Sequence, residues 1–91
     1  MVLQSPITLL DGVTVTGASS AIIPDGAPVT VVISGITSAT VAVEGSVDGS
    51  VFKVIESKTA DACVIVSPST KFIRANVTTY VSGTITVKAL Y

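Results

Sequence analysis

The most regular feature of this sequence is an alternation of apolar and polar positions with a period of two. In the segment Ala39–Glu44, Val41 and Val43 fall on one face of an extended chain. The segment Gly83–Ala89 repeats the pattern, with Ile, Val and Ala alternating with Thr and Lys. Successive side chains of a strand point to opposite faces, so each segment predicts a half-buried β-strand.

Most of the remaining chain consists of short runs rich in Val, Ile and Thr, which suit a pleated surface. Gly, Pro, Asp and Ser separate these runs at spacings of about 8–12 residues, which is typical of antiparallel sheets. We expect a single domain over residues 1–91, all-β, built as a small antiparallel β-sandwich or barrel-like jelly roll of about eight strands. Residues 1–10 are a candidate N-terminal arm. The further predicted strands are Ile7–Leu10, Val13–Thr16, Ala21–Ile23, Pro28–Ser34, Val51–Glu56, Ala62–Val66 and Lys71–Val77.

Turn residues predict two hairpins. The loop Gly45–Ser50 supplies two glycines between alternating segments, so it should join the strand before it to the strand that starts at Val51. A second hairpin is expected between Lys71–Val77 and Thr84–Leu90, with Tyr80 close to its turn.

Four apolar side chains are expected in the core on the basis of these elements. Phe52, Val54 and Val43 would share one core face of the first hairpin. Cys63 lies in an uninterrupted apolar run, so we expect it to be a small buried side chain and not a reactive thiol.

Composition excludes more functions than it suggests. The 91 residues are 48% hydrophobic and only 12% charged, with a net charge of −1, no His and one Cys. Without His there is no Ser-His-Asp or Cys-His nucleophile, and a single Cys forms neither an internal disulfide nor a thiolate metal cage. We therefore expect no enzymatic activity, no cofactor and no metal site.

The charges and the N-terminal segment also argue against nucleic-acid and membrane partners. Lys and Arg do not cluster, so electrostatic binding to nucleic acid or to an anionic membrane is not expected. The first Lys is Lys53, and no basic segment precedes an apolar run as in a signal peptide. The chain is expected to be made in the cytoplasm, and its small core favours oligomerisation as a source of stability.

Two charged residues stand out as candidate contact residues. Asp48, near Glu44, offers oxygen ligands for calcium, but acids do not recur there at alternate positions, so a turn or a partner contact is favoured. Arg74 is the only arginine. It is expected either to pair locally with an acid (Asp48, Glu56 or Asp61) or to lie at a subunit interface.

Three segments carry a resemblance to a known class of protein. They are Val43–Phe52, of the form V-x-G-S-x-D-G-x-x-F, then Phe72–Val77, which reads F-I-R-A-N-V, and Ser82–Val87, which reads S-G-T-I-T-V. Together they resemble small structural proteins of tailed bacteriophages, and the resemblance covers the chain from Ser38 onward. It implies a capsid decoration (cement) protein on the virion surface, made in the host cytoplasm. Its partners would be the major capsid protein and copies of itself, as a homotrimer or another small symmetric cluster.

The interface of such a protein would use exposed segments of the chain. A terminal arm can add to the sheet edge of a neighbour, which makes the arm residues Leu3, Ile7 and Leu9 interface candidates. Asp48, Arg74 and Tyr80 are candidates on the hairpin and the strands.

Two alternatives remain open. One is another virion component, a neck or tail adaptor or a fibre-associated protein. The other is a discoidin-like carbohydrate-binding module, because S-x-D-G hairpins also occur in such domains, with Asp48 and Tyr80 near the sugar. Phe52 stands where many relatives of both kinds, phage proteins and discoidin-like domains, have Trp. Against the carbohydrate-binding module, only Tyr80 and Tyr91 could provide an aromatic platform.

Overall fold

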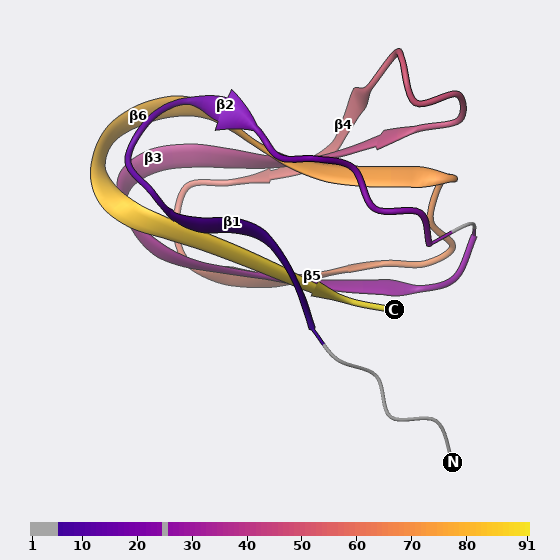
Figure 1. Ribbon diagram of the computed structural model, residues 1–91. Coiled ribbons are helices and arrows are strands. Elements are labelled where there is room, and N and C mark those ends of the chain that lie inside the picture. The colour runs from indigo at the N-terminus through magenta and orange to yellow at the C-terminus, as the bar shows by residue number, and fades with distance from the viewer. Residues whose placement is uncertain (1–5, 25) are drawn as a thin grey trace.

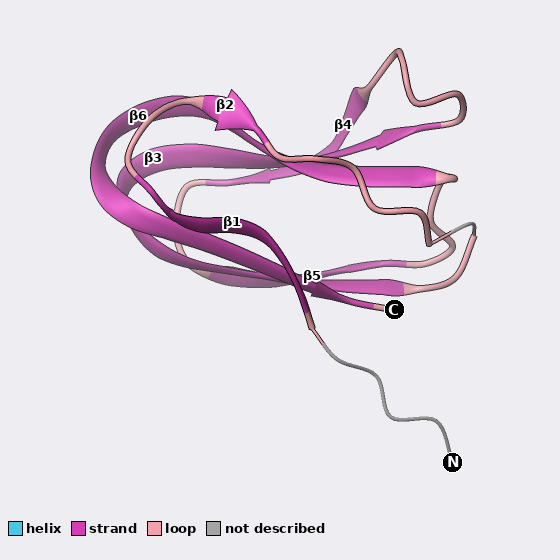
Figure 2. Ribbon diagram, viewed as in Figure 1, coloured by secondary structure: helices cyan, strands magenta, loops and turns pink. Residues whose placement is uncertain are grey.

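The structure is a computed structural model that describes residues 6–24 and 26–91, and in this part of the chain every regular element is a strand. All strand pairs are antiparallel, which confirms the predicted all-β, antiparallel class (Figure 2). The strands are β1 (Ile7–Val13), β2 (Gly17–Ala18), β3 (Val29–Ser46), β4 (Lys53–Lys58), β5 (Ala62–Val66) and β6 (Phe72–Leu90).

Two long strands, β3 and β6, form the centre of the sheet. They pair with each other from Thr30 opposite Leu90 to Ser46 opposite Phe72. Along one half of this pair, β1 lies beside β6 and β5 lies beside β3. Along the other half, the neighbours are β2 and β4. Figure 1 shows β3 and β6 turning back together at one end, so the two halves of the sheet lie over each other.

Glycines allow both central strands to bend at the same place. Gly35 in β3 has φ +84° and Gly83 in β6 has φ +123°, a region that L side chains rarely adopt. A Cβ at Gly35 would lie 1.8 Å from the carbonyl oxygen of Thr84, so the two backbones also approach closely here. The bend therefore requires glycine for two reasons: the positive φ at both positions, and the lack of space for a Cβ at Gly35.

The continuous strands correct two predictions. The strand count of about eight is wrong, because two pairs of predicted strands are each one strand that bends at its Ser-Gly dipeptide. The hairpin between Lys71–Val77 and Thr84–Leu90 does not form, because both segments pair with β3 instead of with each other. The sandwich or jelly roll is not confirmed either, since all six strands are hydrogen-bonded into one sheet that folds over itself.

The core lies between the two halves of the folded sheet. It takes the alternate, inward side chains of both long strands, as the period of two requires. Members from β3 and β6 that are at most 1% exposed are Val29, Val31, Ile33, Val41, Val43, Ile73, Ala75, Val77, Ile85, Val87 and Ala89.

Three of the expected core residues lie elsewhere. Val43 is buried, but Val54 is 56% exposed and Phe52 is half-buried before β4 begins, because β4 is an edge strand with one partner. Cys63 is exposed, because it alternates with the buried Val64 along β5. An uninterrupted apolar run conceals that alternation, so the sequence could not show which side of β5 faces the core.

The described part of the N-terminal region from Ile7 onward belongs to the sheet. Residues 7–10 belong to β1, which pairs with β6, so this part of the candidate arm is a strand in the fold. Residues 1–5, including the interface candidate Leu3, lie outside the described residues. The predicted strand Ala21–Ile23 is reduced to a single bridge between Ile22 and Ile73. In the described chain no helix is long and apolar enough to cross a membrane.

Candidate functional site

The loop between β3 and β4 is ordered by two polar side chains. The Asp48 Oδ1 atom accepts hydrogen bonds from the backbone N–H groups of Ser50 (2.8 Å) and Val51 (3.1 Å) and from the Ser46 hydroxyl (3.0 Å). The Ser46 hydroxyl in turn accepts from the backbone N–H of Gly49 at 2.9 Å. These bonds, first of all the one from Ser50, hold the pKa of Asp48 below its ordinary value, because they favour the charged carboxylate. Asp48 is therefore an organiser of the turn, and it remains exposed.

The same loop packs against the start of β6. Gly49 has φ +79°, and a Cβ on it would lie 3.3 Å from the ring of Phe72. Phe72 is directly opposite Ser46 in the pairing of β3 with β6. The loop therefore lies over the first residues of the F-I-R-A-N-V segment.

An ion pair occupies the outer face of the sheet beside this loop. The Arg74 Nε–H donates to Glu44 Oε1 at 2.7 Å, and the Asn76 amide donates to Glu44 Oε2 at 3.0 Å. The Arg74 guanidinium also lies over the Phe52 ring, 3.9 Å from its centre. Glu44 is only 6% exposed, because it lies on β3 between Arg74 on β6 and Val54 on β4. A buried carboxylate with two donors is a satisfied structural group.

Sequence reasoning gave Arg74 the wrong partner. Of the three acids expected to pair with it, Asp48 orders its own loop, Glu56 pairs with Lys58 at 3.2 Å, and Asp61 accepts from the backbone N–H of Ile36 at 2.9 Å. In the alternating segment Ala39–Glu44, Glu44 falls on the polar face, and side chains on that face are normally exposed to solvent. Only the register that places it opposite Arg74 identifies it as the partner.

Tyr80 lies at a distance from this cluster. Its ring packs against the core, and its hydroxyl donates to the carbonyl oxygen of Gly83 beside the bend. Tyr80 pairs with Ala39, seven positions before Ser46 on β3, which is roughly 23 Å along the strand. The structure therefore does not bring Tyr80 and Asp48 into one site, so these two residues do not form the common carbohydrate site that the discoidin-like alternative requires.

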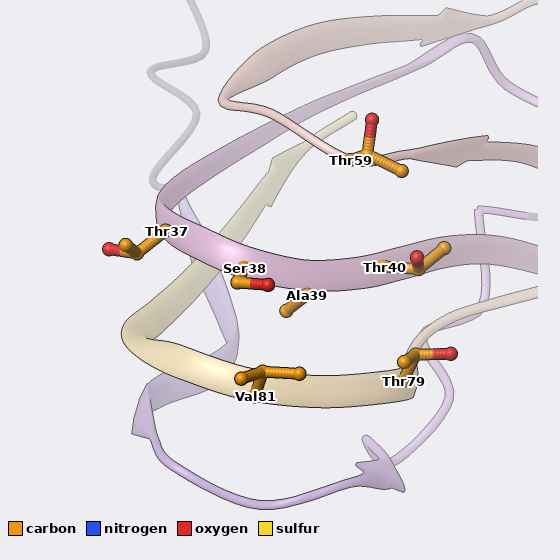
Figure 3. A pocket seen from close by; sticks show the side chains of 7 residues that line it. All are labelled: Thr37, Ser38, Ala39, Thr40, Thr59, Thr79 and Val81. Carbon is orange, nitrogen blue, oxygen red and sulfur yellow. The ribbon is translucent and has the colours of Figure 1, made fainter.

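A shallow hollow of about 250 Å³ lies between the two long strands and the connection after β4. Figure 3 shows its lining, Thr37, Ser38, Ala39, Thr40, Thr59, Thr79 and Val81. None of these side chains is charged or aromatic, so the hollow offers hydroxyl groups for hydrogen bonds but no acid, base or stacking platform. The sequence pattern does not reveal this hollow, because its lining comes from three segments that are far apart in the chain: β3, β6 and the connection after β4.

The remaining candidates have ordinary positions. Ile7 is 36% exposed at the start of β1, whereas Leu9 packs against the core. Residues 6–24 and 26–91 hold no group of three or more His, Cys, Asp or Glu side chains placed to bind a metal ion.

Apolar side chains are exposed on the outer face of the half-sheet that contains β5. Ile65 is 70% exposed, Val32 47% and Leu90 37%, and Cys63 is exposed beside them. A hollow of about 260 Å³ adjoins this face, and its lining is mainly apolar atoms of Pro6, Thr30, Val32, Lys88, Ala89 and Leu90. Lys88, opposite Val32, is the charged residue among them. A surface of this kind is suited to contact with another protein.

Comparison of the chain with protein-family models, with curated proteins and with solved structures gives no match in any of the three.

Proposed function

We propose that this chain is a structural protein of a tailed-bacteriophage virion, and specifically a capsid decoration protein that stabilises the head by contacts between subunits. The observation that carries the proposal is the resemblance of three segments, V-x-G-S-x-D-G-x-x-F, F-I-R-A-N-V and S-G-T-I-T-V, to such proteins. The first two segments contact each other through Gly49 with Phe72 and through Phe52 with Arg74. The residues of these two segments therefore form one structural unit.

The surface supports an assembly role on physical grounds. Only 12% of the residues are charged, and large apolar side chains are exposed at Val47 (78%), Val51 (59%) and Ile65 (70%). Few ions must lose water when such a surface meets a neighbour, so subunit contacts cost little desolvation. The proposed partners are the major capsid protein and further copies of this chain, in a trimer on threefold positions or another small symmetric cluster.

The test is the presence and copy number of the chain in purified particles of the virus whose genome encodes it. We expect quantitative mass spectrometry to find it in a fixed ratio to the major capsid protein, and cryo-electron microscopy to place it on the head. A small copy number set by the symmetry of the tail would mean a neck or tail adaptor. Absence from particles would overturn the virion role.

A rebinding experiment tests which surface meets the head. Particles made without the chain are mixed with purified chain, and the bound fraction is measured by sedimentation. The exposed apolar tip of the β3–β4 loop is the proposed contact, so Val47→Lys should weaken rebinding at least about tenfold, because it buries an unpaired charge. The matched control is Val15→Lys, at a residue that is 65% exposed elsewhere. Equal rebinding of both variants would exclude the loop as the contact.

A further inference from the structure

We propose that β5 is an assembly edge through which two copies of this chain join, antiparallel and around a twofold axis, into one sheet that continues across the dimer. β5 pairs on one side only, with residues Val29–Ile33 of β3, and this register has no irregularity. Among the described residues no strand lies along its other side, so that row of backbone N–H and C=O groups is available for pairing.

The other edges of the sheet carry features that oppose such pairing. β4 contains Lys53, Glu56 and Lys58 and has a bulge opposite Val43 and Glu44. β1 contains Asp11 and two irregularities of register, and β2 is only two residues long. Charges, bulges and shortness are the means by which proteins protect sheet edges. β5, with the sequence Ala-Cys-Val-Ile-Val, has no charge, no proline and no bulge.

The charge pattern selects a second copy of β5 as the occupant. If two β4 strands met antiparallel over their full length, Lys53 of each would oppose Lys58 of the other, which is unfavourable. Two β5 strands bring no charges together. The register that pairs all five residues places Val64 on the twofold axis and puts Cys63 of each copy opposite Ile65 of the other.

This register also covers the exposed apolar face. Directly opposed residues of an antiparallel pair lie on the same side of the sheet, so Cys63 and Ile65 of the two copies would contact each other on the outer face. Val32, which pairs with Cys63 and is 47% exposed, would extend this contact. On the inner face, Val64 would meet its own copy and lengthen the core layer.

The pairing is a property of the chain alone, so it does not depend on the virion role. Within a virion it would replace the threefold cluster by a twofold one. Purified protein tests it without any particle, and its failure would leave the proposed function intact.

The first experiment measures oligomeric state by sedimentation equilibrium and native mass spectrometry, with a charge-swap pair of variants. In the proposed register, Cys63→Lys/Ile65→Lys puts a lysine opposite a lysine of the other copy at two places. Cys63→Glu/Ile65→Glu likewise puts a glutamate opposite a glutamate at two places. Each variant alone should raise the dimer Kd at least about tenfold, and an equimolar mixture should form the heterodimer. Circular dichroism checks that each variant is folded. Formation of the heterodimer in the mixture shows that β5 of each variant can still pair.

The control is Val15→Lys/Val81→Lys, which adds two lysines at residues 65% and 72% exposed and away from β5. It should dimerise like the unaltered chain. A monomer or a trimer of the unaltered chain at high micromolar concentration would overturn the proposal. So would a dimer that the lysine pair at positions 63 and 65 leaves unchanged.

A disulfide tests the register. In antiparallel pairs, opposed Cα atoms are about 4.5–5.5 Å apart, within the range of a disulfide. Ile65→Cys should therefore give, on mild oxidation, a covalent dimer in which peptide mapping finds position 65 linked to Cys63 of the other copy. Links only between identical positions, or no covalent dimer, would contradict the Val64-centred register.

Discussion

At the scale of single residues, the polar side chains with a structural role gather where β3 ends and β6 begins. Asp48 accepts hydrogen bonds from backbone N–H groups and a hydroxyl in the loop, and Glu44 accepts hydrogen bonds from Arg74 and Asn76 on the outer face. Their geometry fixes the loop and the strand pairing beneath it.

The first prediction concerns Asp48 and pH. Its pKa in the folded chain lies below the ordinary value of 3.8, so its contribution to stability is present above that value and is lost as the pH falls through the lower folded pKa. Asp48→Asn should lower Tm near neutral pH, and the difference from the unaltered chain should shrink as the pH falls below about 4. Thermal unfolding followed by circular dichroism from pH 7 to pH 2.5 measures it.

The control for this pH series is Asp11→Asn, which removes an exposed acid from β1. It should not reproduce the loss of Tm near neutral pH. A Tm difference for Asp48→Asn that stays constant across the series would contradict the role of the charged carboxylate.

The second prediction concerns the ion pair. Arg74→Ala should lower the free energy of unfolding by about 2 kcal/mol, because it leaves the buried Glu44 carboxylate with one donor. Arg74→Ala combined with Glu44→Gln should be more stable than Arg74→Ala alone, since the unpaired charge is gone. Urea unfolding measures both.

The exposed pair of Glu56 and Lys58 provides the comparison. Glu56→Gln should change the free energy of unfolding by less than about 0.5 kcal/mol, because water screens this pair. If Arg74→Ala cost no more than Glu56→Gln, the Glu44 cluster would not contribute to stability.

At the scale of the elements, the fold depends on two strands that continue where turns were expected. β3 and β6 have 18 and 19 residues, and both bend at a Ser-Gly dipeptide. The shorter strands lie beside only one half of the bent pair, β1 and β5 on one half, β2 and β4 on the other. The connections after β1, β2, β4 and β5 each join one half to the other, as the long strands do by bending.

The third prediction tests this bend. Gly35→Ala should cost at least about 3 kcal/mol or prevent folding, because the new Cβ would overlap the Thr84 carbonyl at an unfavourable φ. Gly26→Ala is the matched control, with φ +89° and nothing within 4 Å of the new Cβ, and should cost only about 1 kcal/mol. Urea unfolding compares them, and equal costs would show that φ alone matters.

At the scale of the whole molecule, the described chain is a thin body of 38 × 31 × 17 Å. The short dimension agrees with two sheet layers about 10 Å apart. One cluster of aliphatic side chains fills the space between them, so the two halves are expected to unfold together.

The fourth prediction concerns the distribution of stability. Amides in β3 and β6 that pair with each other should exchange only on global unfolding, whereas those of β2 and the outer edge of β4 should exchange through local opening. Hydrogen exchange followed by NMR measures this order. Fast exchange in the middle of both long strands would contradict a single cooperative core.

The sequence alone determined the class of fold and much of the core. β-Branched residues at a period of two suit a half-buried pleated surface, so the pattern alone places Val41 with Val43, and Ile85 with Val87, on inward faces, and all four are buried. The loop around Asp48 followed from turn chemistry, which is local and therefore visible in sequence. The role of Asp48 in that turn was also visible, although its hydrogen-bond partners were not.

Tertiary structure decided what depends on contacts between distant segments. A Ser-Gly dipeptide permits either a hairpin or a bend, and only the pairing of β3 with β6 selected the bend. Glu44 became buried, and Cys63 exposed, because the register and the edge position of each strand set which side is covered. Strand order, edges and ion-pair partners arise from interactions between segments dozens of residues apart, and a local pattern cannot encode them.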